Sequence, residues 1–82
     1  MNTQQIIDYI KSSVKTTHHA YEEHDLPYDP QIIRSATLKE LRQLDNSVDK
    51  DQFDHAIDEL AADGYVDART QSFVYFKENI LA

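Results

Sequence analysis

The residues of this chain best suited to metal binding or proton transfer lie in the segment 18–24 (HHAYEEH), which holds three histidines and two glutamates. His18 and Glu22 are four residues apart, and so are His19 and Glu23. On a helix this spacing puts each pair on one face, where it could share a metal ion. Solvated helix ends also carry such pairs, and the metalloprotease pattern differs, with two histidines four apart. We expect no bound metal or cofactor, and we keep these residues as a minor alternative, a metal or pH sensor.

A second acidic segment starts at Asp45 and places oxygen-bearing side chains at alternate positions, as a calcium loop does. Its sixth position is Lys50 instead of glycine and its twelfth is Ala56 instead of glutamate, which excludes that motif. The chain has no cysteine and one glycine, so thiolate chemistry and glycine-rich phosphate loops are also excluded. No nucleophile stands beside a base, and the sequence therefore predicts a protein that is not an enzyme.

The chain is short and acidic. Its 82 residues suit one domain, residues 1–82, and its formal net charge is −7. This charge repels phosphate backbones and anionic lipids at long range. The N-terminus lacks the basic and apolar regions of a signal peptide, and no apolar run is long enough to span a membrane. We expect a cytoplasmic protein.

The first half of the chain predicts one long helix over residues 3–23, with Thr3 as its N-cap. Its buried face has the 3-4-3-4 spacing of an amphipathic helix and comprises Ile7, Ile10, Val14, Thr17 and Tyr21. Two prolines end this helix in a loop over residues 24–30. Residues 31–36 fit either a short strand or a first helical turn, because proline also suits the first helical position.

Two further helices are predicted over residues 37–63. Thr37 and Glu40 have capping-box spacing, which predicts a helix over residues 38–44. The expected buried side chains of this helix are Leu38, Leu41 and Leu44. Asp49 and Gln52 predict the start of a third helix over residues 50–63, and Gly64 suits its end. The expected buried stripe of the third helix is Phe53, Ile57, Leu60 and Ala61.

Residues 65–69 and 73–76 are rich in strand-forming side chains and predict a hairpin over residues 65–76. The order of helix, optional strand, helix, turn, helix and hairpin resembles the winged helix-turn-helix superfamily. The resemblance is carried by residues 37–41, the third-helix stripe, residues 63–66 (DGYV) and residues 73–76. It implies an α+β, mostly helical fold of three helices and a C-terminal β-hairpin, the wing.

In DNA-binding members of that superfamily, the third helix enters the major groove, so the resemblance implies that its outward face is the surface of interest. Here that face carries Asp51, Asp54 and Asp58 at spacings of three and four, together with His55. Residues 45–67 hold eight acidic side chains and one lysine, whereas DNA readers use Arg, Lys, Asn or Gln. We expect a regulatory or adaptor module that docks a basic protein surface through these four residues, or mimics DNA; a plain solvated face is the alternative.

The main alternative function is a DNA-binding transcriptional regulator, which the net charge disfavours. It would contact phosphates through Lys39, Arg42, Lys50 and Arg69. It would be a homodimer paired through the first helix and the C-terminal tail. A few scattered cations more often provide solubility than a binding site, and true phosphate contacts would make binding steeply dependent on salt.

Overall fold

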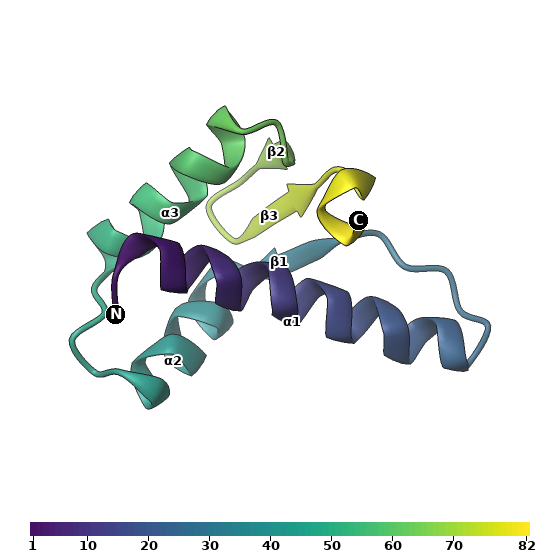
Figure 1. The fold of residues 1–82 in the computed structure, drawn as a ribbon, viewed down its shortest axis with the longest axis horizontal. Coiled ribbons are helices and arrows are strands. Elements are labelled where there is room, and N and C mark those ends of the chain that lie inside the picture. Colours follow the sequence, from purple (N-terminus) through teal and green to yellow (C-terminus); the bar gives the residue numbers. More distant parts are fainter.

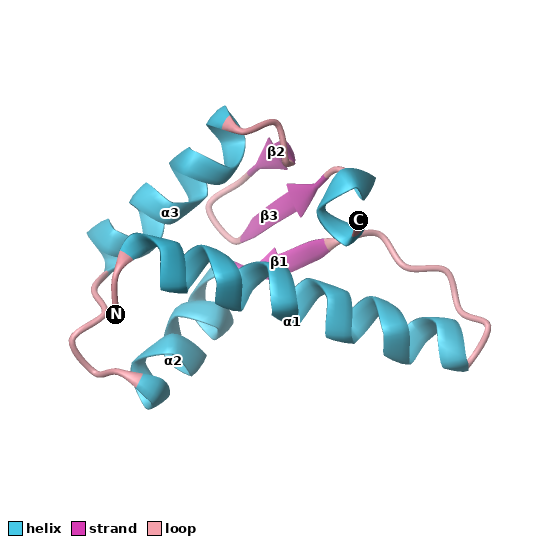
Figure 2. Ribbon diagram, viewed as in Figure 1, coloured by secondary structure: helices cyan, strands magenta, loops and turns pink.

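The computed structural model describes all residues, 1–82, and has seven elements of regular structure. In chain order they are α1 (Thr3–Glu23), β1 (Gln31–Ile33), α2 (Arg34–Leu44), α3 (Lys50–Ala62), β2 (Val66–Arg69), β3 (Phe73–Phe76) and a short 3-10 helix, η1 (Glu78–Leu81). The strands form an antiparallel sheet in the order β1-β3-β2. The domain is therefore α+β and mostly helical (Figure 2), and its element order is compatible with a winged-helix-like fold.

The core lies between the helices and one face of the sheet. It contains Ile6, Ile7, Ile10, Val14, Ile32, Leu41, Val48, Phe53, Ala56, Ile57, Leu60, Val74, Phe76 and Ile80. The first half of α1 crosses this core, while its C-terminal turns project beyond it (Figure 1). This projection explains why Tyr21, predicted to be buried, is 40% exposed.

The predicted bounds of the first helix are confirmed, but its N-cap is Asn2 and not Thr3. The Asn2 side chain accepts a hydrogen bond from the backbone N–H of Gln5 over 2.8 Å, and the Gln5 side chain accepts one from the backbone N–H of Asn2 over 2.9 Å. This reciprocal capping box satisfies two backbone donors at the helix start. A further difference is that Ile6 is buried beside the predicted Ile7.

Residues 31–36 turn out to be both of the alternatives, a strand followed directly by the first turn of α2. The capping box predicted between Thr37 and Glu40 is wrong, because α2 begins at Arg34 and buries Thr37 inside the helix. Pairing with β3 decides where the strand ends, and the backbone N–H of Arg34 still donates to the carbonyl oxygen of Ser72 over 2.9 Å. Non-local pairing therefore overrides the local capping signal.

The predicted buried face of α2 is only partly correct. Leu41 is fully buried and Leu38 packs against the core, but Leu44 is 63% exposed. Leu44 is the last residue of α2, and the chain turns away there toward α3. The prediction for Leu44 was therefore wrong.

The start of α3 is confirmed: Asp49 and Gln52 form the reciprocal capping box, over 2.8 and 3.2 Å. The helix ends at Ala62, and Gly64 has the expected positive φ of 84°. Its buried stripe includes Ala56 in place of the predicted Ala61.

The C-terminal tail folds back onto the same chain, since η1 packs on α1 and Ile80 is buried. Ile80 therefore has an intramolecular partner, while the pairing of two copies through α1 and this tail stays a prediction.

Candidate protein-binding face on α3

The four residues predicted to bind a protein lie together on the outward side of α3, and we call them the α3 face: Asp51, Asp54, His55 and Asp58. The opposite side of the helix is buried in the core through Phe53 and Ile57. Asp51, His55 and Asp58 are exposed, while Asp54 is half-buried. The helical spacing thus brings the predicted residues onto one surface, but with unequal access to solvent.

Asp54 is held by two cations. The Arg34 guanidinium donates to one carboxylate oxygen, and the Lys50 ammonium donates to the other over 3.2 Å. The Arg34 guanidinium carbon also lies 5.9 Å from the centroid of the Phe53 ring. Both oxygens of Asp54 are therefore engaged within the domain. The spacing within α3 predicted that Asp54 faces outward, but it could not show this pairing, because Arg34 lies 20 residues earlier, at the start of α2.

Asp58 is bound from the other side, by the hairpin. Arg69, the last residue of β2, donates from Nη1 to Oδ1 of Asp58 over 2.6 Å. The Asp58 side chain keeps 63% of its exposure, so its carboxylate stays accessible to a partner. His55 Nε2 lies 3.4 Å from Oε1 of Glu59, one turn further along α3.

Asp51 forms no ion pair in the chain. It lies in the first turn of α3, where a negative charge interacts favourably with the helix dipole. The groups of the α3 face that a partner can reach are thus the free carboxylate of Asp51, the exposed carboxylate of Asp58 and the imidazole of His55.

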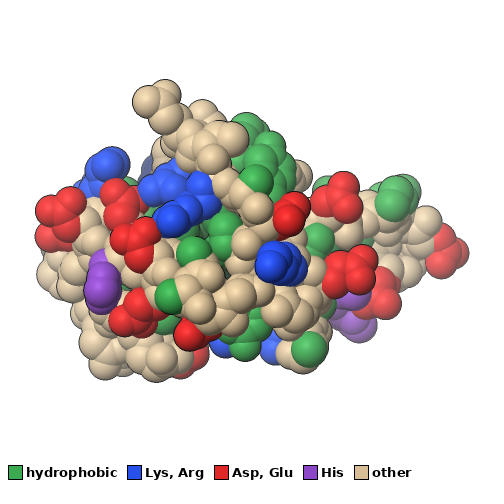
Figure 3. Space-filling model, turned by 90° about the horizontal axis from the view of Figure 1, so that it is seen from above, with side chains coloured by type: hydrophobic (Ala, Val, Ile, Leu, Met, Phe, Trp, Pro, Cys, Tyr) green, Lys and Arg blue, Asp and Glu red, His purple; other side chains and the backbone are tan.

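The residues predicted for DNA binding are not all brought together. Lys50 and Arg69 line an open polar hollow of about 800 Å³, with Arg34 and the turn residues Thr70, Gln71 and Ser72. Lys39 and Arg42 do not line it, and Arg42 donates from Nε to the carbonyl oxygen of Val48 over 2.9 Å. Figure 3 shows cationic and acidic side chains intermixed at the α3 end of the molecule, so that end is not a uniformly basic surface.

The histidine segment forms two separate pairs near the C-terminal end of α1. His18 Nδ1 lies 3.2 Å from Glu22 Oε1, and His19 Nε2 lies 3.1 Å from Glu23 Oε1. No group of three or more histidine, aspartate or glutamate side chains in the chain is placed to hold a metal ion. These residues therefore have the geometry of polar pairs along one helix.

None of the helices combines the length and the apolar character needed to cross a membrane. The fold and the α3 face together define a small α+β domain whose outward helix carries carboxylates bridged to neighbouring elements. Comparisons with known protein families, with curated proteins and with solved structures give no match. A functional proposal therefore rests on the geometry of this surface.

Proposed function

We propose that this chain is a winged-helix module that binds a protein through the α3 face. Support for the winged-helix assignment comes from the order α1-β1-α2-α3-β2-β3 and from the sheet order β1-β3-β2. In this arrangement the β2–β3 hairpin is the wing, and Arg69 ties it to α3. The α3 face and the wing would then form one continuous surface.

The observation that carries the proposal is the pairing of the cations nearest to α3 with α3 aspartates. Arg34 and Lys50 are bound to Asp54, and Arg69 is bound to Asp58. A DNA duplex that contacted these cations would bring its phosphates close to Asp54 and Asp58, whose negative charges already compensate them. Like charges placed so close are strongly unfavourable, especially as an interface loses water.

A basic protein surface meets a smaller obstacle, because Asp51 forms no ion pair and the carboxylate of Asp58 stays exposed beside Arg69. Lysine or arginine side chains of a partner can approach Asp51 and Asp58 without displacing Arg34 from Asp54. Complementary charges of this kind raise association rates and select partners more than they add affinity. The function that follows is that of a regulatory or adaptor module with a basic protein partner.

The test uses amide NMR spectra of the isotopically labelled domain. A short peptide of alternating lysine and alanine serves as the basic probe at low salt, and a short random-sequence DNA duplex is the comparison. We expect the peptide, and not the duplex, to shift the amide signals of α3. Asp51→Asn combined with Asp58→Asn should weaken peptide binding by about tenfold.

The matched control is Asp8→Asn combined with Asp25→Asn, which removes the same charge from α1 and the following loop. Asp25 has a φ of 53°, a conformation that asparagine accepts. Equal weakening by the control pair, or peptide shifts away from α3, would refute the proposal. Asp54 is avoided as a target because a change there would also unbalance Arg34 and Lys50 inside the domain.

DNA binding remains the second candidate function because of the hollow that Arg34, Lys50 and Arg69 line beside the wing. Its expected signature is duplex binding that falls steeply as salt rises. Such binding should also be lost when Lys50→Gln and Arg69→Gln are combined. Fluorescence anisotropy with the same duplex measures both effects and decides between the two functions.

A further inference from the structure

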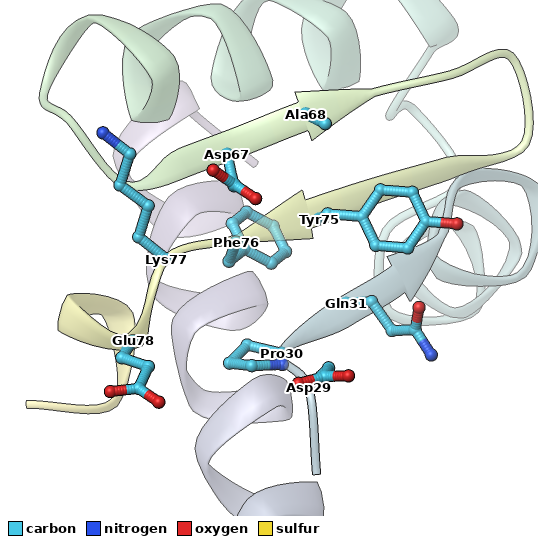
Figure 4. Close-up of a pocket in the computed structure, with 9 residues that line it drawn as sticks. All are labelled: Asp29, Pro30, Gln31, Asp67, Ala68, Tyr75, Phe76, Lys77 and Glu78. Carbon is cyan, nitrogen blue, oxygen red and sulfur yellow. The ribbon is translucent and has the colours of Figure 1, made fainter.

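A second surface lies on the side of the sheet that faces away from the helices. Alternation along β3 buries Val74 and Phe76 and turns Phe73 and Tyr75 outward. The cross-strand register adds their neighbours on β1 and β2. We call the resulting surface the outer sheet face; it comprises Gln31, Ile33, Ala68, Phe73 and Tyr75. Figure 4 looks onto this side of the sheet, with α1 behind the strands.

The outer sheet face presents ordered apolar groups to solvent. The rings of Phe73 and Tyr75 stack with centroids 5.8 Å apart and planes inclined by 22°. Ile33 lies directly across from Phe73 in the sheet and is 50% exposed. Side chains held in place on a sheet lose little conformational entropy when they bind, so they are efficient anchors for a partner.

The charged side chains beside the outer sheet face are mostly negative. A hollow of about 700 Å³ adjoins Tyr75, and its charged lining is Asp29, Asp67, Glu78 and Lys77. Figure 4 shows the Asp67 carboxylate between β2 and β3, with Asp29 next to Pro30 below. The three acidic residues of this lining form no ion pair in the chain, in contrast to Asp54 and Asp58 on α3.

We propose that the outer sheet face docks a peptide segment of a protein partner that presents an arginine next to an apolar side chain. The apolar side chain packs on Phe73 and Ile33. The guanidinium enters the hollow, stacks against Tyr75 and pairs with the unpartnered carboxylates. Arginine suits this environment because its planar cation both stacks on aromatic rings and binds carboxylates in a bidentate manner.

The same charges argue against a nucleic acid on this surface. Bases also stack on aromatic side chains of sheets, but their phosphates need nearby cations. Here the charged lining of the hollow has three carboxylates and a single lysine, so phosphates would be repelled. The outer sheet face is separate from the α3 face, and this proposal stands independently of the function proposed for α3.

The test titrates the labelled domain with an acetylated peptide of alternating arginine and leucine, while amide NMR spectra locate the binding. We expect shifts in β1 and β3, and no comparable shifts with a peptide that has glutamate in place of arginine. Asp29→Asn combined with Asp67→Asn should raise the Kd by about tenfold. The control pair, Asp8→Asn with Asp25→Asn, should leave the Kd unchanged.

Tyr75→Thr is the second variant, since threonine keeps the strand propensity and removes the stacking ring. A dispersed spectrum like that of the unaltered domain shows that the variant folds, and its peptide Kd should rise by about tenfold or more. Shifts confined to α3 would overturn this proposal while leaving the function of the α3 face intact. Equal binding of the glutamate peptide, no binding at all, or tighter binding of a short oligothymidylate to β1 and β3 would also overturn it.

Discussion

Arg69 at the end of β2 donates a hydrogen bond from Nη1 to Oδ1 of Asp58 on α3 over 2.6 Å, and this bond ties the hairpin to the outward helix face. A second pair, Arg34 with Asp54, ties the start of α2 to the same helix. The two pairs differ in burial. The side chains of Arg34 and Asp54 are 20% and 31% exposed, whereas those of Arg69 and Asp58 are 41% and 63% exposed.

This difference predicts unequal coupling energies. A double-mutant cycle with Arg34→Ala and Asp54→Ala should give a coupling of about 1–2 kcal/mol, because the pair is partly shielded from water. The same cycle for Arg69→Ala and Asp58→Ala should give about 0.5 kcal/mol or less, as exposed pairs do. Urea unfolding of the single and double variants measures both coupling energies. Equal values would contradict the view that the burial of each pair determines its coupling energy.

We expect the domain to lose stability in acid because of the contacts of Asp45. Its carboxylate accepts hydrogen bonds from the Met1 ammonium and from the hydroxyl and backbone N–H of Ser47, the latter two over 2.6 and 3.0 Å. Together these donors, the ammonium first, hold the pKa of Asp45 well below its usual range. The stabilisation is therefore complete above the ordinary aspartate pKa of about 4 and is lost as the pH falls below it.

The measurement compares urea midpoints of the unaltered domain and of Asp45→Asn across this pH range. We expect Asp45→Asn to lower the urea midpoint at about pH 7. At about pH 2 the effect should be much smaller, because the ionised Asp45 side chain stabilises the fold less as the pH falls below its pKa in the unfolded chain. Asp8→Asn, an exposed change on α1, is the control and should matter little at either pH. An equal loss for Asp45→Asn at both pH values would show that the charge of Asp45 is not what stabilises.

We expect a second loss of stability at alkaline pH because of the hydrogen bond of Tyr9. Its hydroxyl donates to Oε2 of Glu40 over 2.7 Å and links α1 to α2. Burial, the hydrogen bond and the charge of Glu40 raise the pKa of Tyr9 to about 12. Because the pKa in the unfolded chain is about 10, the stabilisation is present below that pH and is lost as the pH rises toward 12.

Ultraviolet titration of the phenol groups checks this prediction. Tyr9 should ionise near pH 12, and the variants identify its step in the titration curve. Tyr9→Phe should remove that step, and Glu40→Gln should move it to lower pH because a neutral acceptor repels the phenolate less. An unchanged step in Tyr9→Phe would mean that another tyrosine produces it.

Gly64 should be costly to replace. It follows α3 with a φ of 84°, and a Cβ added there would meet nothing within 4 Å. The cost of Gly64→Ala is therefore the strain of a left-handed backbone, about 1 kcal/mol, and Gly64→Asn should cost less. Chemical unfolding separates the three proteins, and a Gly64→Ala domain as stable as the original would count against this account.

The elements that follow from short-range patterns could be predicted from the sequence. Apolar spacing predicted the helix α1, the Asp49 and Gln52 pair predicted the start of α3, and Gly64 predicted the region where α3 ends. Each of these signals depends on contacts between residues within about one helical turn, so neighbouring residues in the sequence contain the information.

What the tertiary structure alone decided are the contacts between elements. Strand pairing moved the start of α2 to Arg34 and made the Thr37 capping box irrelevant. The position of Arg34 next to α3 then converted Asp54 from an open acidic group into a bridged one. By contrast, Asp51 on α3 and Asp67 beside the outer sheet face are among the carboxylates that form no ion pair. The physical reason is that the charge on a surface depends on which side chains the fold brings within a few ångströms, and residues far apart in the chain supply them.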